Sequence, residues 1–129
     1  MSVEDTHALK RVEPVLLVAV GGFVGATSRH AVATALPGGF PWGTLAVNVA
    51  GSFALGVVLY EAHLADVLAR ETRLVVGTGF LSSFTTYSTF AVQTASLSPG
   101  LAVVNVGANY ALGLLAVLAG RRVVGGVVG

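Results

Sequence analysis

The charged side chains of this chain lie in three short stretches, and the long uncharged intervals between them constrain its fold more than any other feature. The stretches are residues 1–13, 61–73 and 121–122, and Arg29 is the one charged residue outside them. The intervals are long enough for helices of the ~20 residues that cross ~30 Å of hydrocarbon. With a mean hydropathy of +0.83 and 10% charged residues, the chain is far more apolar than a soluble domain. We therefore predict an all-α membrane protein.

Turn residues divide the uncharged intervals into four predicted spans. Residues 37–39 (Pro-Gly-Gly) end the first span, and residues 98–100 (Ser-Pro-Gly) separate the last two. Pro14 is expected in the first turn of the first helix, where its missing N–H matters little. The spans are 14–36, 43–63, 74–96 and 101–120, within a transmembrane unit 14–121 that follows an N-terminal segment 1–13 and precedes a tail 122–129. The short loops predict antiparallel neighbours and leave no room for a soluble catalytic domain.

Basic residues predict the orientation of the spans. If the N-terminus is cytoplasmic, that side carries six basic residues and the other side only one, Arg29; the six are Lys10, Arg11, Arg70, Arg73, Arg121 and Arg122. Cytoplasmic loops are enriched in Lys and Arg, so both termini are predicted inside the cell. A cleaved signal peptide over the first span is an alternative, but Arg29 and His30 stand where a signal would be neutral.

Residues 77–90 place two glycines and a dense run of Ser, Thr and Tyr hydroxyls inside the third span. Lipid offers no hydrogen-bond partners, so these groups must be satisfied by protein or water. We expect the helix to unwind around 82–86, in the middle of the membrane, and to leave backbone carbonyls that can coordinate a cation such as Na⁺. A kink without a ligand is the alternative.

Polar and small residues follow helical spacing in the other spans. Thr44, Asn48 and Ser52 share one face of the second span, and Asn105 and Asn109 share one face of the fourth. Interhelical hydrogen bonds explain any single asparagine, but three of them beside a hydroxyl-rich break favour a polar route through the membrane. Small residues four apart, such as 21 with 25 and 52 with 56, predict close helix packing and a second copy or partner that completes the route.

Two aromatic residues follow the hydroxyl-rich run. Tyr87 and Phe90 are three residues apart and share a helix face. Ring edges are electropositive and favour a small anion, although aromatic pairs at this spacing more often pack against each other.

These motifs resemble the Fluc (CrcB) family of fluoride channels over residues 15–121. The matching segments are 22–29 (Gly-Phe-Val-Gly-Ala-Thr-Ser-Arg), 43–48 with 51–53, 77–90, and 109–113 with Gly120. The most specific is 85–90, Thr-Thr-Tyr-Ser-Thr-Phe, which is similar to the family's Thr-Thr-Phe-Ser-Thr-Phe. The resemblance implies an antiparallel dimer of four-helix subunits with two fluoride pores and one structural Na⁺ that is not transported.

The resemblance also implies a role for each matching position. Arg29 would attract anions at the vestibule, and Asn48 would donate a hydrogen bond to fluoride. Backbone carbonyls of Ser82 and Thr85 would hold Na⁺. The pore positions are Asn48, Tyr87, Phe90, Ser88, Thr89 and Asn109.

Three positions depart from the family pattern. Ser82 stands where the family usually has glycine. The backbone carbonyl that would bind Na⁺ is kept, so the substitution bears on backbone strain and not on the ligand. Tyr87 stands where phenylalanine is usual, and its hydroxyl removes part of the positive ring edge. Asn109 replaces a common serine with a larger group that either faces fluoride or narrows the route.

The implied function is passive export of fluoride across the cell membrane, which lowers its cytoplasmic concentration and toxicity. An antiparallel homodimer needs one sequence to insert both ways, whereas the basic-residue bias favours one topology. We therefore expect an oppositely oriented homologous chain as partner, with a homodimer left open.

Two other functions remain as alternatives. An accessory subunit of a heterodimeric channel would fold a partner without conducting. A small proton-coupled drug exporter would need a carboxylate within the membrane, but the acidic residues lie at or beyond the ends of the predicted spans. An enzyme is disfavoured because His7, His30 and His63 are scattered and form no catalytic or metal-binding pattern.

Overall fold

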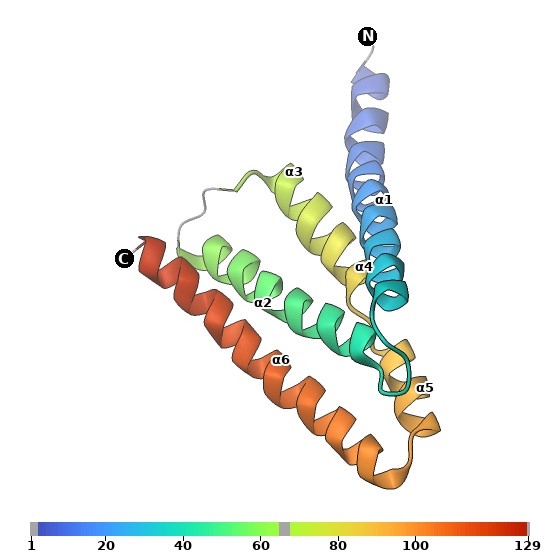
Figure 1. The fold of residues 1–129 in the computed structure, drawn as a ribbon. Coiled ribbons are helices and arrows are strands. Elements are labelled where there is room, and N and C mark those ends of the chain that lie inside the picture. The colour runs from blue at the N-terminus through green and yellow to red at the C-terminus, as the bar shows by residue number, and fades with distance from the viewer. Residues whose placement is uncertain (1–2, 65–67, 129) are drawn as a thin grey trace.

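The chain folds into helices that run alternately up and down (Figure 1). The computed structural model describes residues 3–64 and 68–128, and every regular element in these ranges is helical. Asp66 and the terminal residues Met1, Ser2 and Gly129, which entered the predictions above, lie outside the described residues. The elements are α1 (Val3–Ala35), α2 (Trp42–Leu64), α3 (Arg70–Arg73), η1 (Leu74–Leu81), α4 (Ser82–Phe84), α5 (Ser88–Ser96) and α6 (Pro99–Val128).

Three of these helices are long and apolar enough to cross a membrane, by length and composition. They are His7–Ala35, Trp42–Glu61 and Pro99–Val127, which correspond to the first, second and fourth predicted spans. The third predicted span, 74–96, is divided, because α4 ends at Phe84 and α5 begins only at Ser88. In Figure 1 the segment from α3 to α5 leads from the end of α2 back down to the start of α6. The all-α prediction is confirmed for the described residues.

Two helices extend further than the sequence predicts. α1 begins at Val3, so the placement of Pro14 in its first turn is wrong. The residues before Pro14 include Ala8, Leu9 and Lys10, which are strong helix formers and extend the helix on the N-terminal side of the proline. α6 likewise continues beyond Gly120 to Val128, because no proline or helix-ending turn follows the two arginines.

Glycines let α1 lie directly against η1. A Cβ on Gly21 would overlap the Val75 carbonyl oxygen, and one on Gly25 would overlap the Phe80 carbonyl oxygen. Gly79 makes the reciprocal approach, since its Cβ would lie within 3 Å of the Val18 carbonyl oxygen and of Gly21 Cα. The close packing predicted from small residues four apart is therefore present, and it joins the first and third passes backbone to backbone.

The third pass changes its helical type before it breaks. Residues 74–81 form a π-helix, and Ser82–Phe84 return to α-helical geometry. The expected unwinding at Ser82 is wrong: Ser82 lies in the α-helical residues Ser82–Phe84, and its hydroxyl donates to the carbonyls of Thr78 and Gly79 in the preceding turn. The chain leaves helical geometry at Thr85, whose φ of −82° and ψ of 157° are extended, and the break covers residues 85–87.

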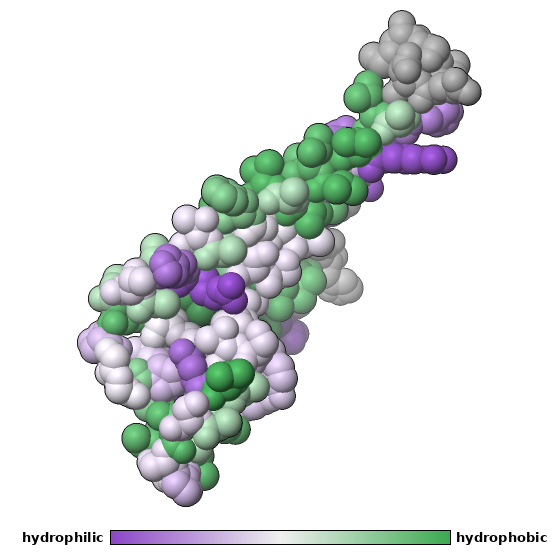
Figure 2. All heavy atoms as spheres, turned by 90° about the vertical axis from the view of Figure 1, so that its right-hand side faces the viewer, coloured by the Kyte–Doolittle hydropathy of each residue, from purple (hydrophilic) through white to green (hydrophobic). Residues whose placement is uncertain are grey.

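Much of the apolar surface of the single chain is uncovered. Figure 2 shows hydrophobic side chains along the arm that ends at the N-terminus, with hydrophilic ones near its tip. Phe23 in α1 is 74% exposed and Val103 in α6 is 73% exposed. A surface of this kind is expected of helices that face lipid or another subunit.

Candidate functional site

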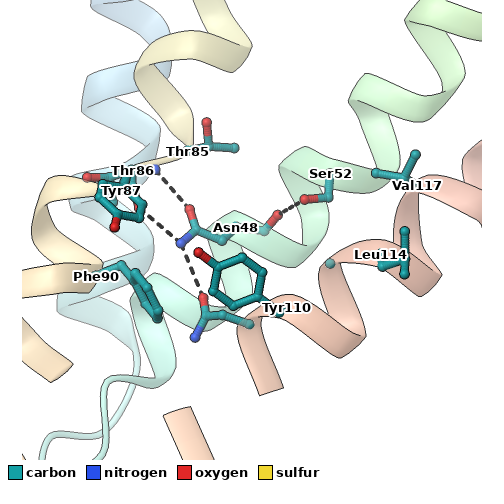
Figure 3. A pocket seen from close by; sticks show the side chains of 11 residues that line it. Asn48, Ser52, Thr85, Thr86, Tyr87, Phe90, Tyr110, Leu114 and Val117 are labelled. Atoms are coloured by element: carbon teal, nitrogen blue, oxygen red, sulfur yellow. Dashed lines mark hydrogen bonds between the residues drawn. The ribbon is translucent and has the colours of Figure 1, made fainter. Parts of the chain in front are cut away.

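A pocket of about 410 Å³ opens beside the break in the third pass (Figure 3). The break and the start of α5 form one wall, α2 forms the second and α6 the third. It is open on one side to the outside of the single chain. Its lining combines amide and hydroxyl groups with aromatic rings and aliphatic side chains: Asn48, Ser52, Thr85, Thr86, Tyr87, Phe90, Asn109, Tyr110, Gly113, Leu114 and Val117.

Asn48 connects α2 to the backbone of the break. Its Oδ1 accepts the Thr86 N–H at 2.8 Å, and its Nδ2 donates to the Thr86 carbonyl at 3.0 Å. An unbroken helix would send the Thr86 N–H to the carbonyl of Ser82, four residues earlier. Asn48 therefore stabilises the break by replacing one helical hydrogen bond, and it removes that donor from the Ser82 carbonyl.

Asn48 also begins a chain of hydrogen bonds that continues into α6 and α5. Its Nδ2 donates to Asn109 Oδ1 at 3.3 Å, and Asn109 Nδ2 donates to Asn105 Oδ1 at 3.0 Å. Asn105 Nδ2 then donates to Thr94 Oγ1 at 2.9 Å, and the Thr94 hydroxyl donates to the Phe90 carbonyl. Asn105 is only 1% exposed, so this chain pairs polar groups that would otherwise be buried without partners.

Three aromatic rings lie together at the same pocket. Phe90 is buried, and its ring centroid is 5.9 Å from that of Tyr87 and 6.2 Å from that of Tyr110. The Phe90 and Tyr110 rings meet edge to face at 77°. Such a group presents both ring edges and ring faces to a small species in the pocket.

The structure brings together some of the site residues predicted from the sequence and separates others. Asn48, Thr85, Tyr87, Phe90 and Asn109 all line the pocket. Ser88 and Thr89 are exposed at the start of α5, outside the lining, and Ser82 lies one turn before the break. Arg29, half-exposed in α1, is not among the lining residues either.

Sequence reasoning missed part of the site. Tyr110 carried no signal beyond its place next to Asn109, and nothing in the local sequence joins Thr94 to Asn105 across two helices. Thr44, which shares a face with Asn48, donates to Gln93 Oε1 at 2.6 Å, a contact that no spacing rule predicts. The Asn105 and Asn109 spacing did predict that these two side chains lie together.

Comparison with known proteins identifies the family. The family model described as CrcB-like protein, Camphor Resistance (CrcB), matches residues 16–121, which include every residue that lines the pocket. The chain belongs to the CrcB family. The resemblance read from the sequence motifs is thereby confirmed.

Curated CrcB relatives cover most of this chain. "Fluoride-specific ion channel FluC 1" of Natronomonas pharaonis is 60% identical over 110 residues, 85% of this chain and 92% of the relative. The protein of the same name from Haloarcula marismortui is 56% identical over 93% of this chain and 92% of its own length. "Fluoride-specific ion channel FluC 2" of Halobacterium salinarum is 56% identical over 83% of each chain.

Acidic and imidazole side chains do not build a metal site in the described part of the CrcB chain. No group of three or more His, Asp or Glu that could hold a metal ion occurs within residues 3–64 and 68–128.

Proposed function

We propose that this CrcB chain is a pore-forming subunit of a fluoride-selective channel that releases fluoride passively from the cell. The relatives named as fluoride-specific ion channels support the transported ion. The observation that carries the proposal is the Asn48 amide, which lies with two aromatic rings beside the helix break. This is a channel function and includes no chemical step, so we propose no enzymatic activity.

Fluoride is small and strongly hydrated, so a pore must replace its water with donors that hold it weakly enough for release. Asn48 Nδ2 is the amide donor nearest the break, and the edges of the Tyr87 and Phe90 rings add weak positive charge. Ser88 and Thr89 extend this polar track from the exposed start of α5, and Arg29 attracts anions to the vestibule. These roles follow the family pattern, and the pocket supports them for Asn48, Tyr87 and Phe90.

The backbone carbonyl oxygens at the break are suitable ligands for a structural Na⁺. Asn48 diverts the Thr86 N–H away from the Ser82 carbonyl, and Thr85 turns into extended geometry. Carbonyl oxygens released from a helix are suitable ligands for a hard cation. We propose that the carbonyls of Ser82 and Thr85 hold Na⁺ at the middle of the membrane, where the ion would hold the break in shape and is not transported.

The open side of the pocket supports a dimer. Tyr87 is 73% exposed and Tyr110 is 63% exposed in the single chain, so a second subunit would complete the wall around them. We propose an antiparallel dimer in the cell membrane, with both termini of this chain in the cytoplasm. The basic residues favour that one orientation, so the partner is an oppositely oriented homologous chain.

Fluoride efflux from liposomes that contain the purified full-length chain tests the function. We expect fluoride release, measured with a fluoride electrode, without release of chloride, and its loss in Asn48→Ala. The same assay with a co-purified homologous chain tests the partner. Release that needs the partner but is unchanged by Asn48→Ala would mean that this chain is an accessory subunit. No fluoride release in either form would contradict the channel function.

A further inference from the structure

The Asn109 side chain presents its oxygen, and not its nitrogen, to the pocket donor. Asn48 Nδ2 and Asn109 Oδ1 are 3.3 Å apart, which is longer than the usual 2.9–3.0 Å of such bonds. The two hydrogens of Asn48 Nδ2 are thus directed to the Thr86 carbonyl and to Asn109. An anion that enters the pocket meets a donor that is already engaged.

The orientation of both amides is forced by backbone groups. The Thr86 N–H can only donate, so the Asn48 atom 2.8 Å from it must be Oδ1. The Asn105 carbonyl can only accept, so the Asn109 atom 2.8 Å from it must be Nδ2. Neither amide can be turned over without placing two donors or two acceptors against each other.

Asn105 holds Asn109 in this orientation. Both the carbonyl oxygen and Oδ1 of Asn105 accept from Asn109 Nδ2, at 2.8 and 3.0 Å. Asn105 is itself fixed, because it is 1% exposed and donates to Thr94 Oγ1. The N–H groups of Asn109, which would attract an anion, therefore point away from Asn48.

We propose that Asn109 competes with fluoride for the Asn48 amide donor. Its Oδ1 accepts a hydrogen bond from Asn48 Nδ2 until an entering fluoride displaces this oxygen. Asn105 is the positioning residue that keeps the Asn109 oxygen toward Asn48. This inference rests on the proposed channel function and adds a residue that sets how readily the pore accepts its ion. The bond to be displaced is the longest in the chain of amides, so the competitor is released more easily than any other contact of Asn48.

Substitutions at Asn109 test the inference through fluoride flux. Asn109→Ala removes the competing oxygen, and Asn109→Ser replaces it with a hydroxyl on a shorter side chain. We expect faster fluoride release in both, on the order of several-fold for one membrane hydrogen bond, with half-saturation at lower fluoride. Asn109→Asp keeps the size but adds a second oxygen, so we expect slower release. Val103→Ala, at an exposed position of the same helix, is the matched control and should leave the rate unchanged.

The direction of the change in fluoride flux on loss of Asn109 distinguishes this role from simple helix packing. If Asn109 only joined α2 to α6, its loss would lower flux and thermal stability together. Equal or slower release in both Asn109→Ala and Asn109→Ser, with an active wild-type chain, would overturn the inference and leave the channel function intact. Absence of fluoride release from the wild-type chain, alone and with its homologous partner, would overturn both.

Discussion

Glycines bring the helices close in both helix pairs of this subunit, but they cover different shares of the two interfaces. In the first pair, α1 and η1, the backbones of Gly25 and Phe80 touch and no described side-chain hydrogen bond joins the two helices. In the second pair, α2 and α6, a similar contact at Gly56 and Gly120 covers only one part of the interface. Further along, the gap is filled by Asn48 and Asn109 and opens into the pocket.

The difference shows how a chain with few polar residues forms both a tightly packed helix pair and a polar site. Backbone contact at glycines leaves no space and needs no polar partner, so the first pair is closed where Gly21, Gly25 and Gly79 meet the facing helix. Larger polar residues hold the second pair apart, and each must be hydrogen-bonded because lipid supplies no partner. The glycine contact at one end of α2 and α6 anchors the helices, and the asparagines shape the pocket at the other.

The strongest test of the polar pair separates the two functions of Asn48. Asn48→Asp keeps an oxygen for the Thr86 N–H but removes the amide donor, whereas Asn48→Ala removes both. We expect fluoride flux to fall on the order of 100-fold in both, because about 1–3 kcal/mol is lost for each buried group left unpaired and 1.4 kcal/mol is tenfold. Hydrogen exchange at Thr86 should increase only in Asn48→Ala. Equal protection of Thr86 in the two variants would contradict the assignment of the break to Asn48.

The closed pair can be broken by adding side-chain volume. Gly25→Val places a branched side chain against the Phe80 backbone, which cannot move away as a flexible side chain could. We expect about 3 kcal/mol or more of destabilisation, above the usual range for an overpacked core, and loss of the folded chain in detergent. Circular dichroism during heating measures this effect. Gly38→Val, at a loop glycine with open space around it, is the control and should melt like the wild type.

A milder substitution tests the glycine anchor of the second pair. A Cβ on Gly120 would overlap the Phe53 carbonyl oxygen, whereas a Cβ on Gly107 of the same helix has no atom within 4 Å. We expect Gly120→Ala to lower the free energy of unfolding by about 1–3 kcal/mol. Gly107→Ala should raise it by about 0.5–1 kcal/mol, because alanine favours helix. The two variants differ by one methyl at two places on α6, so similar melting temperatures would show that the anchor does not stabilise the pair.

The smallest expected effect concerns the aromatic wall. Tyr87→Phe removes a para hydroxyl that makes no described hydrogen bond and restores the positive ring edge. We expect fluoride release to rise by about two- to threefold, the size of a modest aromatic interaction. Tyr60→Phe, at the far end of α2, is the control for the loss of a hydroxyl. A lower rate in Tyr87→Phe would mean that the hydroxyl itself assists the ion.

The fold was largely predictable because hydropathy and turn residues act locally. Uncharged stretches of about twenty residues place the long helices in order, and Pro37 to Gly39 and Ser98 to Gly100 place the turns beside them within a few residues. Helix ends were less predictable, since α1 continues through Pro14 and α6 through both arginines. The site was predicted in part, because motif positions on α2, α5 and α6 met at one pocket while Ser88, Thr89 and Arg29 stayed outside it.

Residue types and their spacing alone predict an all-helical membrane protein of the CrcB family with a weak point in its third pass. Those properties depend on residue type and spacing along one segment. The position of the break and the orientation of the pocket amides depend instead on contacts between helices. The break lies at 85–87 because Asn48, on another helix, takes the Thr86 N–H. Asn109 turns its oxygen inward because Asn105 accepts from its nitrogen, and Asn105 is itself fixed by its bond to Thr94. Hydrogen bonds between segments distant in sequence select one of several locally acceptable arrangements.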